Sequence, residues 1–257
     1  MAKVFLSAGH GGKDPGAIGN GLQEKNVNLN ILLSCKEELE RHGVTVVCSR
    51  TRDENDPVSD EVKEANASKA DIAVSFHTNA GGGDGSETFY YGSDANGKRL
   101  AELCEKHTKA IGQNSRKVAN GSGLWFVKAT NMTAVLCECA FIDNKTDVQI
   151  IDTTAEQKAF GIAYAKAILE YLGIAYKSES AKPVQEQPAS NAFKVKVSIP
   201  NLNIRKGPGT NYAKTGKFTG IGEFTIVETA KGTGSNAGWG KLKSGAGWIS
   251  LDHAKRV

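Results

Sequence analysis

The 257-residue sequence has no apolar run long enough to cross a membrane, since no stretch approaches the roughly 18 consecutive apolar residues that a spanning helix needs. A signal peptide is missing too, because the apolar part of M-A-K-V-F-L-S is too short and this segment is expected to enter the fold directly. These absences predict a chain that is made in the cytoplasm and does not insert into a membrane.

The sequence has only five cysteines. An odd number of cysteines, with no secretion signal predicted, argues against a disulfide framework. Cys137 and Cys139 form C-x-C, which is one signature of a metal site. No second cysteine pair stands at zinc-finger spacing, so we interpret the pair as two small apolar residues on one face of a buried strand. A compact H-E-x-x-H zinc motif is also absent.

The net charge of +4 is distributed unevenly along the chain. Residues 1–175 carry 19 Lys and Arg against 23 Asp and Glu, whereas residues 191–257 carry 11 against 3. This difference predicts a first domain over 1–175, a linker over 176–191 that is poor in large apolar residues, and a second domain over 192–257. The basic second domain is expected to favour an anionic surface.

The first domain alternates strand and helix patterns. Apolar runs predict strands at residues 3–7, 44–48, 71–77, 87–91 and 134–139. Helical periodicity and end signals predict helices at residues 26–42, 59–69, 97–111 and 154–172. This alternation predicts an α/β fold, a twisted mixed sheet flanked by helices. Short β-rich runs broken by Gly and Pro predict a small all-β barrel or sandwich over 192–257.

Four polar residues stand at or near predicted strand ends. His10 follows the first strand, His77 ends D-I-A-V-S-F-H, and Glu138 lies in A-V-L-C-E-C-A-F. Glu24 is placed in the loop before the first long helix, close to His10 in the sequence. Because ligands gather at the carboxyl edge of the strands in α/β sheets, we expect these side chains to share one cleft.

Two histidines and a carboxylate are a common catalytic zinc set, and a further carboxylate is then needed as the base. Structural roles remain open for three of the four: His10 as a turn residue, His77 as a core histidine and Glu24 as a helix-entry carboxylate. Glu138 is hardest to explain in that way, since a carboxylate in an apolar strand is costly to bury without a partner or a function.

Four ordered segments carry a resemblance to a known family. They are L-S-A-G-H-G-G-K-D-P-G-A-I-G, G-L-Q-E-K-N-V-N-L, A-D-I-A-V-S-F-H-T-N-A and A-V-L-C-E-C-A-F-I-D-N. They resemble the motif blocks of zinc-dependent N-acetylmuramoyl-L-alanine amidases, the family of bacterial autolysins, sporulation amidases and phage endolysins. The resemblance covers residues 1–175.

Site roles follow from this resemblance position by position. It implies His10, Glu24 and His77 as zinc ligands, Glu138 as the catalytic carboxylate, and Asn79 as a substrate contact. Two places depart from the family pattern. Ser7-Ala8 replace the usual aspartate-proline, and Lys63 stands where an arginine is common. Neither departure touches an implied ligand.

The C-terminal segment S-I-P-N-L-N-I-R-K-G-P-G-T-N-Y resembles the bacterial SH3-like cell-wall-binding module. Residues 202–205, 207–209 and Tyr212 carry the match, and Trp239 and Trp248, each after a glycine, fit later strands. The net charge of +8 over this region fits anionic wall polymers. Nucleic acid is not expected as a partner, because the basic residues are scattered along strands and no recognition helix is apparent.

Together these features predict a peptidoglycan hydrolase that uses Zn²⁺ and cleaves the amide bond between N-acetylmuramic acid and L-alanine of the stem peptide. The expected setting is a phage or prophage endolysin released through a holin pore, and the alternative is a bacterial autolysin of the same activity. A glycosidase that uses Glu24 and Glu138 would leave the histidines without a purpose. A catalytically silent wall-binding protein would not need all four polar residues.

Overall fold

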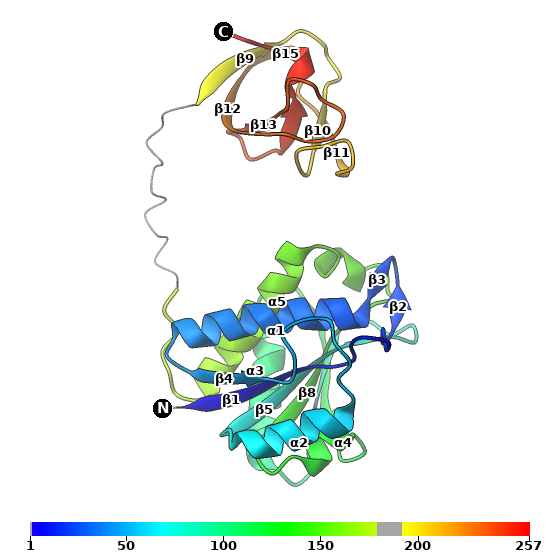
Figure 1. The fold of residues 1–257 in the computed structure, drawn as a ribbon, viewed down its shortest axis with the longest axis vertical. Coiled ribbons are helices and arrows are strands. Elements are labelled where there is room, and N and C mark those ends of the chain that lie inside the picture. Colours follow the sequence, from blue (N-terminus) through cyan, green and yellow to red (C-terminus); the bar gives the residue numbers. More distant parts are fainter. Residues whose placement is uncertain (1, 179–191) are drawn as a thin grey trace. The chain divides into compact units, whose positions relative to one another are not determined.

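The computed structural model describes residues 2–178 and 192–257 of the chain (Figure 1). Two compact units form, unit 1 over Met1–Ser178 and unit 2 over Glu179–Val257. Most of the predicted linker, residues 179–191, lies outside the described residues. In the part of the chain that the structure describes, no helix has the length and apolar character to cross a membrane.

A six-stranded mixed sheet forms the centre of unit 1, with the strand order β4-β1-β5-β8-β6-β7. β4, β1, β5 and β8 run parallel, β6 is antiparallel to β8, and β7 is parallel to β6. The strands are β1 (Lys3–Ala8), β4 (Thr45–Cys48), β5 (Ile72–Asn79), β6 (Ser86–Tyr90), β7 (Ser115–Asn120) and β8 (Thr133–Phe141). The four parallel strands therefore end at the edge of the sheet where β6 and β7 begin.

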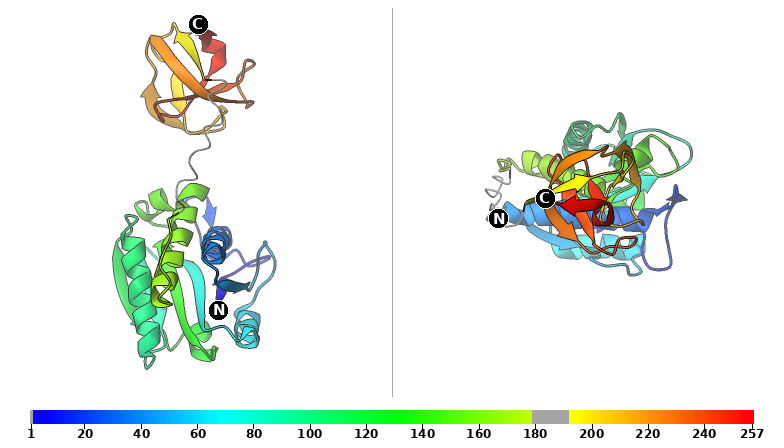
Figure 2. Two further views of the ribbon diagram at one scale, coloured as in Figure 1. Left: turned by 90° about the vertical axis from the view of Figure 1, so that its left-hand side faces the viewer. Right: turned by 90° about the horizontal axis from the view of Figure 1, so that it is seen from above.

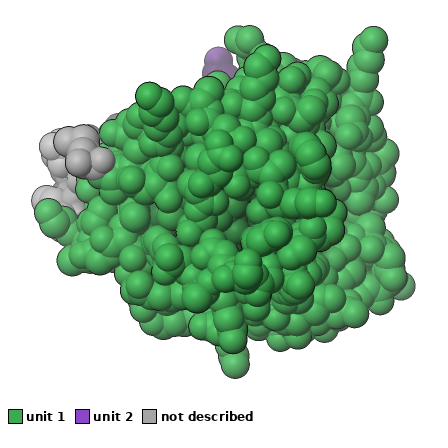
Figure 3. All heavy atoms as spheres, turned by 90° about the horizontal axis from the view of Figure 1, so that it is seen from below, with its two compact units in different colours: residues 1–178 green, residues 179–257 purple. Residues whose placement is uncertain are grey.

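Helices cover both faces of this sheet (Figures 1 and 2). α1, α3 and α5 pack together on one face, and α2 and α4 lie on the other, the side from which Figure 3 views unit 1. The helices are α1 (Glu24–Arg41), α2 (Val58–Ser68), α3 (Ala95–Lys109), α4 (Trp125–Ala129) and α5 (Thr154–Tyr171). This arrangement confirms the predicted α/β class with a mixed sheet flanked by helices.

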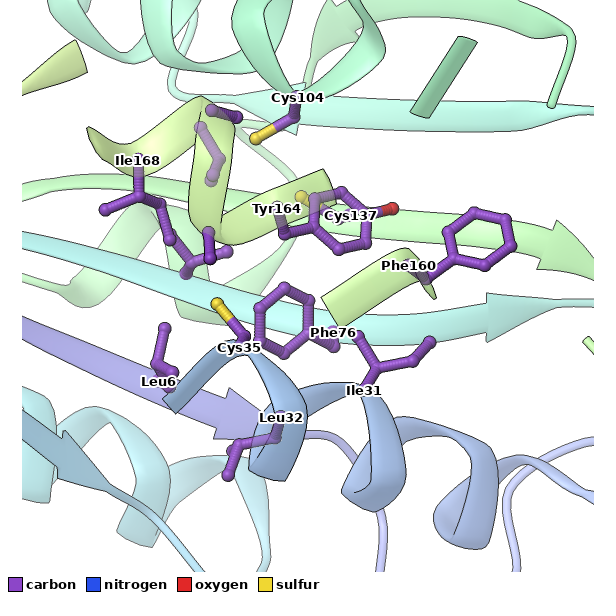
Figure 4. Packing of buried hydrophobic residues seen from close by; sticks show 14 of the residues in the cluster. Leu6, Ile31, Leu32, Cys35, Phe76, Cys104, Cys137, Phe160, Tyr164 and Ile168 are labelled. Carbon is purple, nitrogen blue, oxygen red and sulfur yellow. The ribbon is translucent and has the colours of Figure 1, made fainter. Parts of the chain in front are cut away.

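The larger apolar core lies between the sheet and the layer of α1, α3 and α5 (Figure 4). Phe76 and Cys137 from the strands meet Ile31 and Tyr164 from the helices, and all four are fully buried. Cys139, two residues beyond Cys137, is also a buried free thiol in this core. The C-x-C pair thus packs as apolar side chains, which helps to hold β8 in place.

Several local features differ from the sequence prediction. The edge strand β7 and the short helix α4 were not predicted, because the exposed S-R-K-V-A-N lacks apolar alternation and α4 spans little more than one turn. A two-stranded hairpin, β2 (Ile18–Gly19) and β3 (Leu22–Gln23), precedes α1. Glu24 is the first residue of α1 rather than a loop residue, and its N–H donates to the carbonyl of Ala17 (2.9 Å).

Unit 2 is all-β, with seven antiparallel strands in the order β11-β10-β14-β13-β12-β9-β15. The strands are β9 (Phe193–Val197), β10 (Asn203–Arg205), β11 (Lys214–Phe218), β12 (Gly222–Ala230), β13 (Trp239–Leu242), β14 (Trp248–Ser250) and β15 (Ala254–Arg256). Val197, Ile226 and Ile249 form the middle of its core, and Trp239 and Trp248 are buried. The predicted all-β character is confirmed, and the SH3-like assignment stays a prediction.

Candidate metal centre

The glycine-rich turn after β1 brings His10 to the carboxyl edge of the sheet. His10 itself adopts φ 66°, a left-handed conformation that is uncommon outside glycine. A side chain at Gly9 would collide with the ring of His77. At Gly16, where φ is +64°, a Cβ would lie 2.6 Å from both Glu24 Oε2 and His10 Cδ2. The glycines are therefore required because His10, His77 and Glu24 approach one another so closely.

The carboxylate of Glu24 lies at the centre of this site and is only 4% exposed. Thr78 N–H donates to its Oε1 (3.0 Å), and Ala17 N–H donates to its Oε2 (2.8 Å). His77 Nδ1 lies 3.1 Å from Oε1, and His10 Nε2 lies 3.3 Å from Oε2. Burial alone would raise the pKa of Glu24, but the contacts from the two histidines outweigh it and hold that pKa well below its usual range.

Asp14 orients the ring of His10, and the sequence prediction did not include it. His10 Nδ1 donates to Asp14 Oδ2 at 2.8 Å, which leaves Nε2 directed at Glu24. The hydrogen bond to Glu24 is the main reason that the pKa of His10 is raised to about 9; burial opposes this shift and Asp14 adds to it. A carboxylate on the outer nitrogen is the usual partner of a metal-bound histidine. The position of Asp14, four residues after His10, was the available signal.

Glu138 stands directly opposite His77 in the β5–β8 ladder. Its side chain is half-buried, and its Oε2 has no hydrogen-bond partner within the described residues. Burial raises the pKa of Glu138 to about 7; His77 opposes this shift, while the charges of Glu24 and Glu87 add to it. A carboxyl group with such a pKa exchanges its proton near neutral pH.

The donor set formed by His10, Glu24 and His77 fits a divalent metal ion. One ligand atom from each of the three residues lies within 4.8 Å of the other two. Two imidazole nitrogens and one carboxylate oxygen are the ligand types of a catalytic zinc site, in which a further position stays open. Glu138, on the strand next to His77, provides a carboxylate outside this set.

Comparison with known proteins agrees with this fold. A profile of the family described as N-acetylmuramoyl-L-alanine amidase matches residues 4–170. The chain belongs to this amidase family. The endolysin of Bacillus phage SPP1 is 34% identical over 256 residues, which cover 94% of this chain and 93% of the phage protein.

Two further amidases are similar to the chain. The sporulation-specific N-acetylmuramoyl-L-alanine amidase of Bacillus subtilis (strain 168) is 32% identical over 209 residues, 79% of each protein. Among solved structures, the catalytic domain of CwlV, an N-acetylmuramoyl-L-alanine amidase from Bacillus (Paenibacillus) polymyxa var. colistinus, has a TM-score of 0.64 and 30% identity. That match covers 68% of this chain and 100% of the CwlV domain. The residues matched by the family profile, 4–170, all lie in unit 1.

A cavity of about 400 Å³ lies beside the histidines of this amidase, on the face of the sheet that carries α2 and α4. Asp14, Asp56 and Glu61 give its wall an acidic character. Trp125, at the start of α4, is 53% exposed and forms part of the apolar wall. The cavity therefore pairs an acidic side with an exposed indole.

Asn79 ends β5 at the same edge of the sheet. Its Nδ2 donates to Glu87 Oε2 (3.1 Å), and its Oδ1 accepts the N–H of Ala80 (2.8 Å). Asn79 thus holds a second buried carboxylate, Glu87, which lies opposite Glu138 in the β6–β8 ladder. Glu87 was not predicted as a site residue, because it is one polar residue in the short strand S-E-T-F-Y.

The departures from the amidase pattern lie at the end of β1 and on α2. Ser7 is fully buried and accepts a hydrogen bond from Ser49 Oγ (3.3 Å). Burial raises the pKa of Glu61, and a hydrogen bond with Ser7 opposes this shift in part. The carbonyl of Ala8 accepts from Nε of the buried Arg50 (2.9 Å), which sequence analysis also overlooked. Lys63 is exposed on α2.

Proposed function

We propose that this peptidoglycan amidase is zinc-dependent and hydrolyses the amide bond between N-acetylmuramic acid and the L-alanine of the stem peptide. In this proposal His10, Glu24 and His77 hold the zinc ion, and Glu138 is the catalytic carboxylate. The convergence of the three donors beside a carboxylate with an unpartnered oxygen is the observation that carries the proposal.

When bound by these residues, a zinc ion would lower the pKa of its water to about 7 and would polarise the amide carbonyl. The chain supplies the proton transfers. With a pKa of about 7, Glu138 accepts a proton from the attacking water and then donates it to the nitrogen of the departing L-alanine. The water oxygen ends on the muramyl carbonyl carbon as the C–N bond breaks. Asp14 keeps the ring of His10 in the orientation that presents Nε2.

The decisive experiment separates an amidase from a glycosidase and from a silent binding protein. Purified cell walls incubated with the protein are expected to release new amino groups and no new reducing sugar ends. A chelator is expected to abolish this release, and added zinc to restore it. New reducing ends without amino groups would refute the amidase activity, and release of neither would favour a silent wall-binding protein.

Glu138→Gln tests the role of the carboxylate, because it keeps the shape of the side chain and removes its basicity. We expect this variant to bind zinc and to lose about 10²- to 10⁴-fold in rate, the usual contribution of a general acid–base. Full activity in Glu138→Gln would show that the role is wrong. Loss of zinc binding would show instead that Glu138 is a ligand.

We further propose that unit 2 is an SH3-like module that binds anionic wall polymers and that the protein is an endolysin released through a holin pore. Support comes from the net charge of +8 over residues 191–257 and from the similarity to the phage SPP1 endolysin along 94% of the chain. Even a weak anchor raises the local concentration of substrate. Bacteria that produce the protein with a holin are expected to lyse, and those that produce it alone are not.

A further inference from the structure

A second pocket, of about 310 Å³, lies at the edge of the sheet where β6 and β7 begin. Its lining includes Gly83, Glu87, Arg116, Lys117 and Phe141. Backbone and polar side chains dominate this lining, and two of the side chains are basic. The zinc site described above does not use any of its basic residues.

A β-bulge brings both basic side chains to the same carboxylate. Ser86 pairs with Ser115 and Glu87 pairs with Lys117, so Arg116 is an extra residue in β7. As a result, Arg116 Nε lies 3.0 Å and Lys117 Nζ 3.2 Å from Glu87 Oε1. Since one buried carboxylate faces two cations, the cluster keeps a positive charge to offer to a ligand.

Arg116 is held so that the end of its guanidinium stays available. The group lies over the ring of Phe141, with 5.3 Å from its central carbon to the ring centroid, while Nε faces Glu87. The Arg116 side chain is 46% exposed, and within the described residues no hydrogen bond is formed by either of its terminal nitrogens. A Cβ at Gly83 would collide with the Phe141 ring and with Arg116 Nη1, so the glycine makes room for the stacked pair. A guanidinium fixed in this way is preorganised for a carboxylate.

The position of the pocket relates it to the scissile bond. Glu87 stands opposite Glu138 in the β6–β8 ladder, so the basic pocket adjoins the proposed catalytic carboxylate. The cavity beside the histidines is lined by three carboxyl groups, those of Asp14, Asp56 and Glu61, and it contains no Arg or Lys among its lining residues. The basic pocket is therefore the side of the site that offers Arg and Lys to an anionic group of the substrate.

We propose that Arg116, supported by Lys117, binds a free carboxylate of the stem peptide and makes the amidase selective for it. In peptidoglycan the residue after L-alanine is D-glutamate, whose α-carboxyl group is either free or amidated. The free carboxylate would take the terminal nitrogens of Arg116, and the glycan would lie toward Trp125. This inference rests on the proposed function, because it assumes the muramyl–alanine bond as the bond that is cut.

The test uses N-acetylmuramoyl-L-alanyl-D-glutamate and its α-amide, N-acetylmuramoyl-L-alanyl-D-isoglutamine, as a matched pair, both with the γ-carboxyl group blocked as a methylamide so that the α-carboxylate is the one negative charge of the peptide that differs. Calorimetry with the metal-free protein measures the two dissociation constants, and release of amino groups by the zinc-loaded protein measures the two values of kcat/KM. We expect the free acid to be favoured about tenfold in affinity and in kcat/KM, because one charge-assisted hydrogen-bonded pair contributes a difference of about this size. Equal dissociation constants for acid and amide, or no detectable binding of the acid, would overturn the inference.

Variants assign the preference to this pocket. Arg116→Gln is expected to bring the acid-to-amide ratio of kcat/KM close to one, and Arg116→Lys is expected to retain part of the preference for the acid. Gly83→Ala is expected to reduce the preference without removing a charge. Lys128→Gln, which removes an exposed positive charge on α4, is the control and is expected to keep the wild-type ratio. A full preference in Arg116→Gln would overturn the inference.

The two hypotheses fail in different ways. If whole cell walls release amino groups but acid and amide behave alike, the amidase activity stands and the carboxylate pocket does not. If the acid binds through Arg116 but cell walls release no amino groups, the pocket stands and the proposed function fails.

Discussion

Gly9→Ala tests whether close backbone approach is what allows the metal cluster to form. The backbone of Gly9 is fixed, because its N–H donates to the carbonyl of Phe76 in β5 (3.0 Å). A Cβ at this position would meet three atoms of the His77 ring, and even Nδ1 would be only 2.7 Å away. Ordinary contact begins near 3.5 Å, so the ring has to move by about 1 Å.

This displacement has a predictable size in activity and in stability. His77 Nδ1 now lies 3.1 Å from Glu24 Oε1, and a shift of about 1 Å takes it out of the ligand set; such misplacement costs about 10²-fold in rate. Overpacking of this kind lowers the free energy of unfolding by about 1–3 kcal/mol. Zinc content per chain, amino-group release and urea unfolding of the metal-free protein measure the three effects.

Two further variants make the test of Gly9→Ala specific. Gly123→Ala is the matched control, since it has no neighbour within 4 Å, and we expect it to leave zinc content and rate unchanged. In Gly9→Ala combined with His77→Ala, removal of the ring is expected to recover most of the lost stability but none of the activity. A Gly9→Ala protein with one zinc ion and the full rate would refute this reasoning.

Asp14→Asn weakens the partner of His10 Nδ1, so we expect zinc affinity to fall about 10- to 100-fold in competition with a chromogenic chelator; an unchanged affinity would contradict the orienting role. Burial raises the pKa of Glu38, but Arg41 outweighs it and holds that pKa below its usual range. Such a carboxylate stabilises above its unfolded-state pKa, and this stability is lost as the pH falls through the folded-state value. The Tm difference between wild type and Glu38→Gln should therefore narrow as the pH is lowered from about 7 to about 3. A Tm difference that stays constant over this range would contradict the stabilising role of the Glu38 carboxylate. Thr153→Ala removes the side chain that caps the N-terminus of α5, so we expect the free energy of unfolding, measured in urea, to fall by about 1 kcal/mol; an unchanged free energy would show that this cap does not stabilise the fold.

Strong periodicity made most of unit 1 predictable. The helices α1 and α5 and the strands β5 and β8 carry long apolar patterns, so their existence and approximate bounds followed from the sequence. α4 and β7 did not, because a five-residue helix and an exposed edge strand have too few buried positions to leave a pattern. The sequence pattern predicted that α1 begins at Asn26, two residues later than it does. The structure begins the helix at Glu24, whose N–H donates to the carbonyl of Ala17, a contact that depends on the preceding hairpin.

Residue types and their order predicted the candidate site. His10, Glu24 and His77, each in its motif, were predicted as a metal-ligand set, and the structure brings their possible ligand atoms together. These residues could be found because a polar side chain stands out against glycine or an apolar strand. They lie together at the carboxyl ends of the parallel strands, which is where ligands generally bind in α/β folds.

Only the tertiary structure decided which groups support and surround that set. Asp14 reaches His10 because that residue adopts a left-handed conformation. Glu87 and Arg116 are 29 positions apart in the sequence and meet only because β6 and β7 pair with a bulge. Such contacts depend on strand order and register, which are set by packing across the whole sheet and not by any local pattern.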